Sequence, residues 1–95
     1  MRESLIEKKL RDKGKTLNII VAKWTSPGQT GVPDDIVIYP DGTIHFVELK
    51  TARGTLSAKQ RWWLDRLTKQ GCTCYVIKGQ LGLDLYFEGA LQPWS

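Results

Sequence analysis

The sequence GVPDDIVIYPDGTIHFVELK, residues 31–50, carries the strongest structural signal of the chain. Its apolar run at 35–39 favours a buried strand, and the Pro-Asp-Gly segment at 40–42 is typical of a tight turn. Residues 43–50 then favour a second strand that runs antiparallel to the first. The stretch therefore predicts a β-hairpin.

The segments before the hairpin predict a helix and a strand. An amphipathic stripe indicates a helix that begins near Ser4 and stops at Gly14. Residues 16–24 are rich in β-branched and aromatic residues and predict a strand, and the loop SPGQTGVP at 26–33 cannot continue it.

The segments after the hairpin predict a second helix and a fourth strand. Ser57 and Gln60 form a capping-box pattern that opens a helix reaching about residue 70. Residues 72–78 predict a strand that lies parallel to a hairpin strand, because a helical crossover precedes it. The segment LDLYF at 83–87 suits an edge strand or a short turn and is assigned to neither.

The order of these elements predicts an α/β fold with an αβββαβ core, in which a mixed sheet is flanked by helices. With 95 residues, the chain has room for a single domain, 1–95, and for one chemistry. The hydrophobic fraction of 41% and charged fraction of 25% are those of ordinary globular proteins.

Charge and cysteine content narrow the class of protein. The net charge of +4 suits a polyanionic partner without deciding for one. No run is apolar enough for a signal peptide or a membrane span, so we expect a cytosolic protein with no membrane partner. Cys72 and Cys74 lie two positions apart and have no partners for a zinc site, which predicts free thiols.

Three residues of the hairpin carry a candidate chemistry. Glu48 and Lys50 are two apart on a strand, so their side chains leave the same face. The hairpin brings Asp34 beside Glu48, and paired carboxylates on rigid strands bind a hard cation such as Mg²⁺. An adjacent lysine holds or activates water, or adds positive charge beside a phosphate. The trio predicts hydrolysis of phosphodiesters, whereas a lone Glu-Leu-Lys would equally suit a surface ion pair.

These residues carry a resemblance to known nucleases. GVPDD at 31–35 followed by VELK at 47–50 resembles the PD-(D/E)xK signature of the restriction-endonuclease-like fold. Within that superfamily the chain resembles the VRR-NUC (virus-type replication-repair nuclease) domain, through SPGQTGVPD at 26–34 and FVELK at 46–50. Glu7 in the first helix and Gln60 in the second match further positions of its pattern.

The resemblance implies a metal site and a catalytic lysine. Asp34 and Glu48 are similar to the family's metal ligands, with the main-chain carbonyl of Leu49 as another ligand. Lys50 is similar to the catalytic lysine. The implied cofactor is Mg²⁺ or Mn²⁺.

Glu7 and Gln60 are similar to supporting active-site positions of the family. Each also has a plain structural interpretation, since Glu7 lies among charged helix neighbours and Gln60 is able to close the capping box of Ser57. Asp35 falls at a position that the family leaves variable, and we assign it no role.

The resemblance also implies a substrate. Stand-alone viral members, including those of phages, act as homodimers that cut branched DNA like Holliday-junction resolvases, and a two-fold axis supplies the two active sites needed for paired cuts. Two alternatives stay open. One is a catalytically inert module that binds DNA structures, and the other is a restriction-like or nicking endonuclease that acts on linear DNA.

Four cations are candidates for phosphate contacts, although a solvated surface suits each of them equally: Lys23, Arg53, Lys59 and Arg61. Trp62 recurs with Arg66 and Lys69 on one helical face, which suits either stacking on nucleic acid or a dimer contact, and we favour the dimer contact. His45, the only histidine, alternates away from Glu48 and is interpreted as a surface residue.

Overall fold

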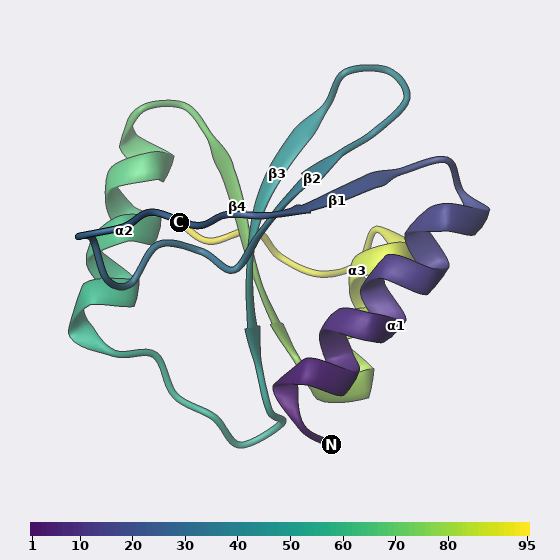
Figure 1. The fold of residues 1–95 in the computed structure, drawn as a ribbon, viewed down its shortest axis with the longest axis horizontal. Coiled ribbons are helices and arrows are strands. Elements are labelled where there is room, and N and C mark those ends of the chain that lie inside the picture. The colour runs from purple at the N-terminus through teal and green to yellow at the C-terminus, as the bar shows by residue number, and fades with distance from the viewer.

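A four-stranded mixed sheet forms the middle layer of the molecule (Figure 1). The computed structural model describes residues 1–95. The strands are β1 (Ile20–Lys23), β2 (Asp35–Ile38), β3 (Ile44–Lys50) and β4 (Thr73–Lys78), and they lie in that order. β2 is antiparallel to β1 and to β3, whereas β4 runs parallel to β3. The predicted α/β fold, including the parallel fourth strand, is confirmed.

Helices cover the two faces of the sheet unequally. α1 (Glu3–Thr16) and α3 (Gly79–Glu88) lie together on one face, and α2 (Ala58–Lys69) lies on the other (Figure 1). None of the three has the length and apolar character needed to cross a membrane. The main core forms between the sheet and the α1/α3 layer, from Ile6, Leu10, Ile19, Val37, Val47, Leu49, Ile77, Leu83 and Tyr86.

The first helix and first strand differ from their predicted bounds. α1 continues two residues past Gly14, because this glycine is buried, and a Cβ there would lie 3.2 Å from Val21. Gly14 therefore serves close packing and does not end the helix. The chain reverses at Asn18, which has a positive φ of 57°, so β1 starts later than predicted. Ser4 lies inside the helix and does not cap it.

Residues 83–87, which the sequence left unassigned between an edge strand and a short turn, belong to neither and are part of α3. Leu83 and Tyr86, three apart, are buried on the face toward the core. Gly82 lets this helix lie against the backbone of β4, where a Cβ would come 3.3 Å from the carbonyl carbon of Ile77. Burial against the sheet thus outweighs the low helix propensity of glycine.

His45 is half-buried, so its interpretation as a surface residue is wrong, although it does face away from Glu48. Its ring packs against three tyrosine rings on this side of the sheet: Tyr39, Tyr75 and Tyr86. The Tyr86 hydroxyl lies 2.7 Å from His45 Nδ1 and 2.8 Å from the Tyr39 hydroxyl. Burial lowers the pKa of His45. These contacts tie α3 to the hairpin.

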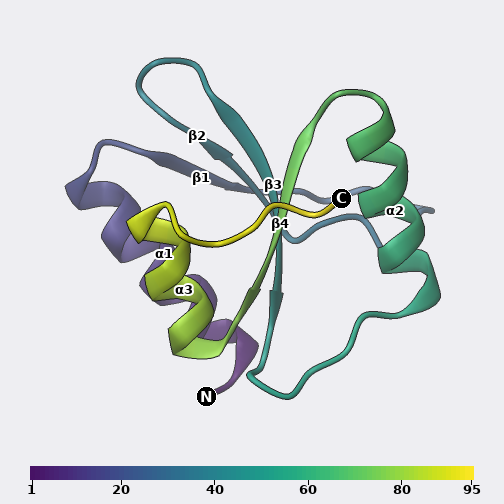
Figure 2. The same ribbon diagram turned by 180° about the vertical axis from the view of Figure 1, so that it is seen from behind.

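The C-terminal segment covers the free edge of β4, as the view from behind shows (Figure 2). The Trp94 N–H donates to the Cys74 carbonyl at 2.8 Å, and its indole N–H donates to Asp65 on α2 at 2.7 Å. An exposed strand edge is thereby blocked. Cys72 and Cys74 are free thiols, as predicted.

Gly31 brings the loop before β2 against α2. Its φ is +89°, and a Cβ there would lie 2.7 Å from Lys59 Cβ and 3.0 Å from the Gln60 nitrogen. Only glycine fits such a close approach to a helix backbone at positive φ.

Replacement of Gly31 by alanine is expected to destabilise the protein more than the same change at Gly28. Both glycines have positive φ, but a Cβ at Gly28 (φ +81°) meets nothing within 4 Å. The left-handed conformation costs each variant about 1–2 kcal/mol, and overpacking adds roughly 1–3 kcal/mol to Gly31→Ala alone. Urea unfolding of the two variants measures the difference, and equal midpoints would contradict a fixed contact between loop and helix.

Candidate active site

The hairpin brings Asp34 to the end of β3. Pairing between β2 and β3 begins with Asp35 opposite Val47, so Asp34 lies just outside the ladder. Its Oδ2 accepts the Leu49 N–H at 2.8 Å, and its own carbonyl accepts the Trp24 N–H at 2.9 Å. Main-chain N–H donors from β3 and from the residue that follows β1 therefore fix Asp34 in place.

Glu48 is buried beside this carboxylate. Only 2% of the residue is exposed, and its side chain leaves β3 on the face toward α2. Burial raises its pKa to about 8, and the charge of Asp34 and a hydrogen bond to the Asp34 carboxyl act in the same direction. The Lys50 ammonium, 3.9 Å from Glu48 Oε2, opposes the shift. Glu48 therefore holds a proton at neutral pH unless another cation lies nearby.

The Gln60 side chain both closes the capping box of α2 and contacts Glu48. Its Oε1 accepts the Ser57 N–H at 2.8 Å and so closes the capping box that begins α2. Its Nε2 donates to Glu48 Oε2 at 3.1 Å. The helix cap and the orientation of the Glu48 carboxyl thus depend on a single amide.

The donor set fits a hard divalent cation. The N–H and carbonyl of a strand residue point to the same side, so the Leu49 carbonyl faces the side on which its N–H binds Asp34. Two carboxylates and a carbonyl offer only oxygen, and Mg²⁺ is usually bound by one or two carboxylates with water completing its shell. No group of three or more His, Cys, Asp or Glu side chains is placed so that it could hold a metal ion. A cation would relieve the repulsion that raises the Glu48 pKa.

Glu7 forms no ion pair with Asp34, Glu48 or Lys50. It lies 3.4 Å from Lys23, and its carboxyl neighbours that of Asp35, which is fully buried and 3.5 Å from Arg11. Burial raises the pKa of Asp35 to about 7, and the neighbouring Glu7 carboxyl adds to the shift.

Asp35, to which the sequence assigned no role, therefore anchors α1 to β2. Alternation along the strand contained a signal for this, because Asp35 shares a face with the buried Val37.

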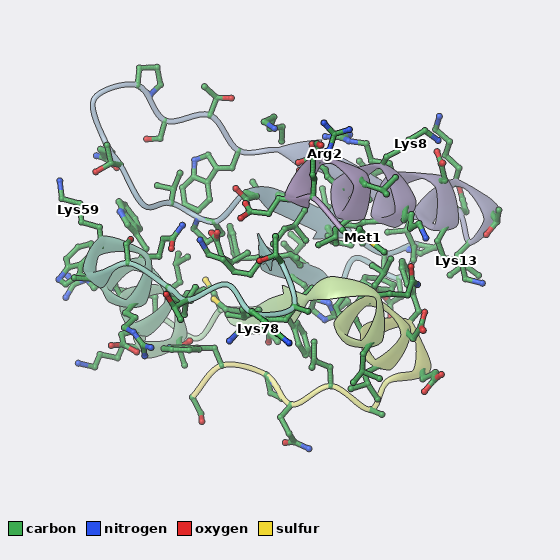
Figure 3. All side chains as sticks on the ribbon, turned by 90° about the horizontal axis from the view of Figure 1, so that it is seen from below. Met1, Arg2, Lys8, Lys13, Lys59 and Lys78 are labelled. Carbon is green, nitrogen blue, oxygen red and sulfur yellow. The ribbon has the colours of Figure 1, made fainter.

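The candidate phosphate contacts are dispersed. Lys23 pairs with Glu7, Arg61 lies 5.8 Å above the Trp94 ring, and Arg53 is exposed in the linker before α2. Lys59 lies on α2, on the other side of the molecule from Lys13 of α1 (Figure 3). None of these four candidates forms an ion pair with Asp34 or Glu48; only Lys50 does.

The central hairpin of this mixed sheet carries two carboxylates and a lysine at its end. This arrangement is typical of restriction-endonuclease-like nucleases. The family model of the VRR-NUC domain matches residues 4–81, and the chain belongs to this family. A solved VRR-NUC domain superimposes with a TM-score of 0.85 at 29% identity, over 90% of this chain and 94% of the other.

Two further proteins are similar. Hjc of Archaeoglobus fulgidus, a Holliday junction resolvase, shares the fold with a TM-score of 0.59 at 18% identity, over 80% of this chain and 67% of its own. "Putative nuclease p44" of Acyrthosiphon pisum secondary endosymbiont phage 1 is 46% identical over 50 residues, 53% of this chain. The match spans about half of that relative's length, 54%. The family and this relative support a nuclease.

Without divalent metal, stability is expected to fall as pH rises from about 4 to about 8. Asp35 and Glu48 have folded pKa values raised to about 7 and about 8, so their contribution is complete below their unfolded values and is lost as pH passes the folded ones. The slope is roughly 1.4 kcal/mol per pH unit for each carboxyl that is protonated only in the folded state.

Thermal unfolding in EDTA at several pH values measures this loss. Mg²⁺ should restore more stability at pH 8.5 than at pH 5.5, and Glu48→Gln should abolish that restoration. Asp35→Asn serves as the matched control, since it removes the other carboxyl whose pKa is raised but keeps Glu48. A melting temperature that rises with pH in EDTA would contradict the assignment.

Proposed function

We propose that the protein is a metal-dependent endonuclease that hydrolyses phosphodiester bonds of branched DNA as a homodimer. The observation that carries this proposal is the convergence of Asp34, Glu48 and Lys50 at one end of β3, where the Glu48 carboxyl is buried against a second carboxylate. Such a pair is costly for stability alone, and paired carboxylates of raised pKa are typical of functional sites.

Each residue of the site has a separate task. Asp34, Glu48 and the Leu49 carbonyl would hold Mg²⁺ or Mn²⁺. When bound, the cation polarises the phosphoryl oxygen and makes a neighbouring water more acidic. The Lys50 ammonium orients the attacking water and offsets charge on the phosphate. Gln60 keeps the Glu48 carboxyl in one orientation through its 3.1 Å hydrogen bond.

The charge supports a DNA substrate, and the fold supports a branched one. The net charge of +4 suits a polyanion. The fold is that of Hjc, which is a Holliday junction resolvase. The alternatives, an inert module and an endonuclease of linear DNA, have no specific observation in their favour.

A row of isoleucines supports the homodimer. The strand register aligns Ile20 with Ile38 and Ile38 with Ile44, so the three side chains lie side by side on one face. Ile20 is 60% exposed and Ile44 is 47% exposed. An apolar row without charges suits a self-complementary contact across a two-fold axis.

The variant Ile20→Asp is expected to weaken dimerisation at least tenfold, because it buries an unpaired charge in the proposed interface. Sedimentation equilibrium measures the dissociation constant. Leu81→Asp is the matched control, since Leu81 is an exposed apolar residue on α3. A wild-type monomer, or a dimer indifferent to Ile20→Asp, would rule out this interface.

Lys50→Ala is expected to reduce cleavage of a labelled four-way junction by about 10²–10³-fold, the usual cost of one group that stabilises transition-state charge. Wild-type cleavage should require Mg²⁺ or Mn²⁺ and stop in EDTA. Lys13→Ala, which removes a lysine from α1, should cut normally.

Flap and linear duplex DNA serve as comparison substrates. Equal cutting of linear and branched DNA would favour the restriction-like or nicking alternative. Binding of all three DNAs without cleavage in either metal would favour the inert module.

A further inference from the structure

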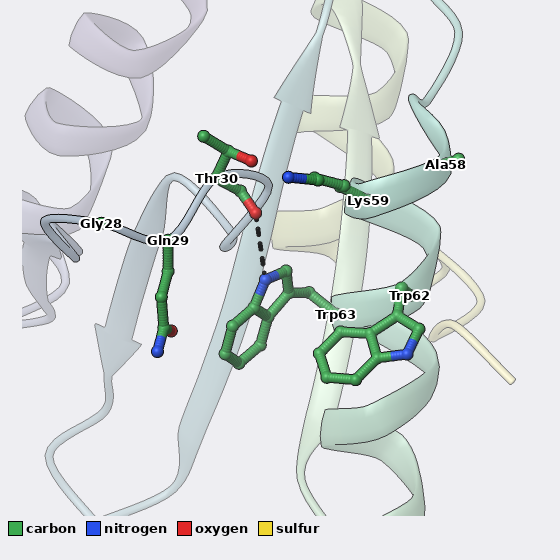
Figure 4. Close-up of a pocket in the computed structure, with 7 residues that line it drawn as sticks. All are labelled: Gly28, Gln29, Thr30, Ala58, Lys59, Trp62 and Trp63. Carbon is green, nitrogen blue, oxygen red and sulfur yellow. Dashed lines mark hydrogen bonds between the residues drawn. The ribbon is translucent and has the colours of Figure 1, made fainter.

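An open pocket lies between α2 and the loop before β2 (Figure 4). Its volume is about 520 Å³, within the range of small-molecule sites. Gly28, Gln29 and Thr30 form one wall, and Ala58, Lys59, Trp62 and Trp63 form the other. Asp34 and Glu48 do not line this pocket. Two of its residues already have candidate roles, since Lys59 was interpreted as a possible phosphate contact and Trp62 as a stacking residue or a dimer contact.

The two indoles make a corner of different rigidity. Trp63 is fixed, because its ring nitrogen donates to the Thr30 carbonyl at 3.1 Å and its ring packs edge-on against Trp24 at 5.8 Å. The Trp62 ring lies at 88° to the Trp63 ring with centroids 5.2 Å apart, and Trp62 is 57% exposed. A flat aromatic ligand thus finds one fixed wall and one open face for stacking.

The charges around this corner favour an anionic partner. Lys59 is the only charged residue of the lining. α2 as a whole carries four cations and one acid, Asp65, which is already bonded to the Trp94 indole. A planar apolar ring attached to a negatively charged group matches this surface, and a nucleotide combines the two.

The pocket is connected to the candidate active site. Gly31 presses the pocket loop onto α2 at Lys59 and Gln60, and Gln60 in turn binds Glu48. Aromatic rings also run from Phe46, two residues before Glu48, to Trp24 at 5.4 Å and then to Trp63. Gln60 thus follows the pocket residue Lys59 in α2 and also binds Glu48, so the pocket adjoins the candidate active site.

We propose that this pocket takes an unpaired nucleobase of the DNA substrate, stacked on Trp62, with a neighbouring phosphate on Lys59. The inference rests on the proposed function, since it assumes that DNA reaches the site. A paired base in duplex DNA already has both faces stacked, so only an unpaired base is free to enter. A second copy of the chain fits less well, because a two-fold contact here would bring cationic surfaces together.

The test uses two duplexes that differ by one base. One carries a single bulged thymidine, and the other carries an abasic residue at the same position. Fluorescence anisotropy in EDTA measures binding without cleavage. Wild type is expected to prefer the bulged thymidine about tenfold, the usual contribution of one stacked base, and Trp62→Ala is expected to lose this preference. Trp62→Phe should restore most of it.

Leu81→Ala is the matched control, as it removes another exposed apolar side chain far along the sequence on α3. A wild type without base preference, or without measurable binding, overturns the proposal. The proposal is also overturned if Trp62→Ala keeps the preference for the bulged thymidine. It is likewise overturned if Trp62→Ala weakens the dimer in sedimentation but leaves the base preference unchanged.

The same DNAs with Mg²⁺ separate this proposal from the proposed function. Cleavage without a base preference would contradict the proposed nucleobase pocket and support the proposed nuclease. A preference that depends on Trp62, with no cleavage in any metal, would keep the pocket and remove the nuclease.

Discussion

Glu48 is buried beside Asp34, and three neighbouring parts of the chain contact these two carboxyls. A carboxyl that is 2% exposed needs a proton, a cation or hydrogen-bond donors, and each neighbouring element supplies part of this requirement. β3 itself contributes Lys50, and α2 contributes the Gln60 amide. The loop before β2 brings Asp34 and is held by the Leu49 N–H. Moving any of these elements would leave a buried polar group without a partner.

The two faces of the sheet differ in how the helices cover them. On one face, α1 and α3 cover the strands and form the main apolar core. On the other face, α2 packs on β4 and leaves the isoleucine row of β1, β2 and β3 uncovered. The proposed dimer contact lies on this uncovered part of the sheet.

Local patterns made much of this arrangement predictable. The hairpin, the capping box and the parallel fourth strand each follow from residues close together in sequence. The pairing of Asp34 with Glu48 follows too, because a short hairpin leaves little freedom in register. Local sequence patterns do not predict structure that depends on contacts between segments far apart in the sequence. α3 forms from a glycine-containing segment only because β4 and α1 bury one side of it, and His45 is enclosed by tyrosines from three elements. Asp35 was missed because its partners, Arg11 and Glu7, lie on a helix that the hairpin pattern does not include.

One turn and a half of α2 builds two surfaces at once. Gln60 and Leu64 face inward, where the amide orients Glu48 and the leucine is buried. Lys59 and Trp62 face outward and form the pocket. Because side chains on opposite faces of a helix change independently, residues 59 and 62 are free to alter what the outer surface binds without moving the carboxyl. Gly31 limits that freedom, since its contact with Lys59 and Gln60 sets the distance between the loop and the helix for both surfaces. The proposed base preference and the orientation of the Glu48 carboxyl thus depend on different side chains, but they share one backbone contact.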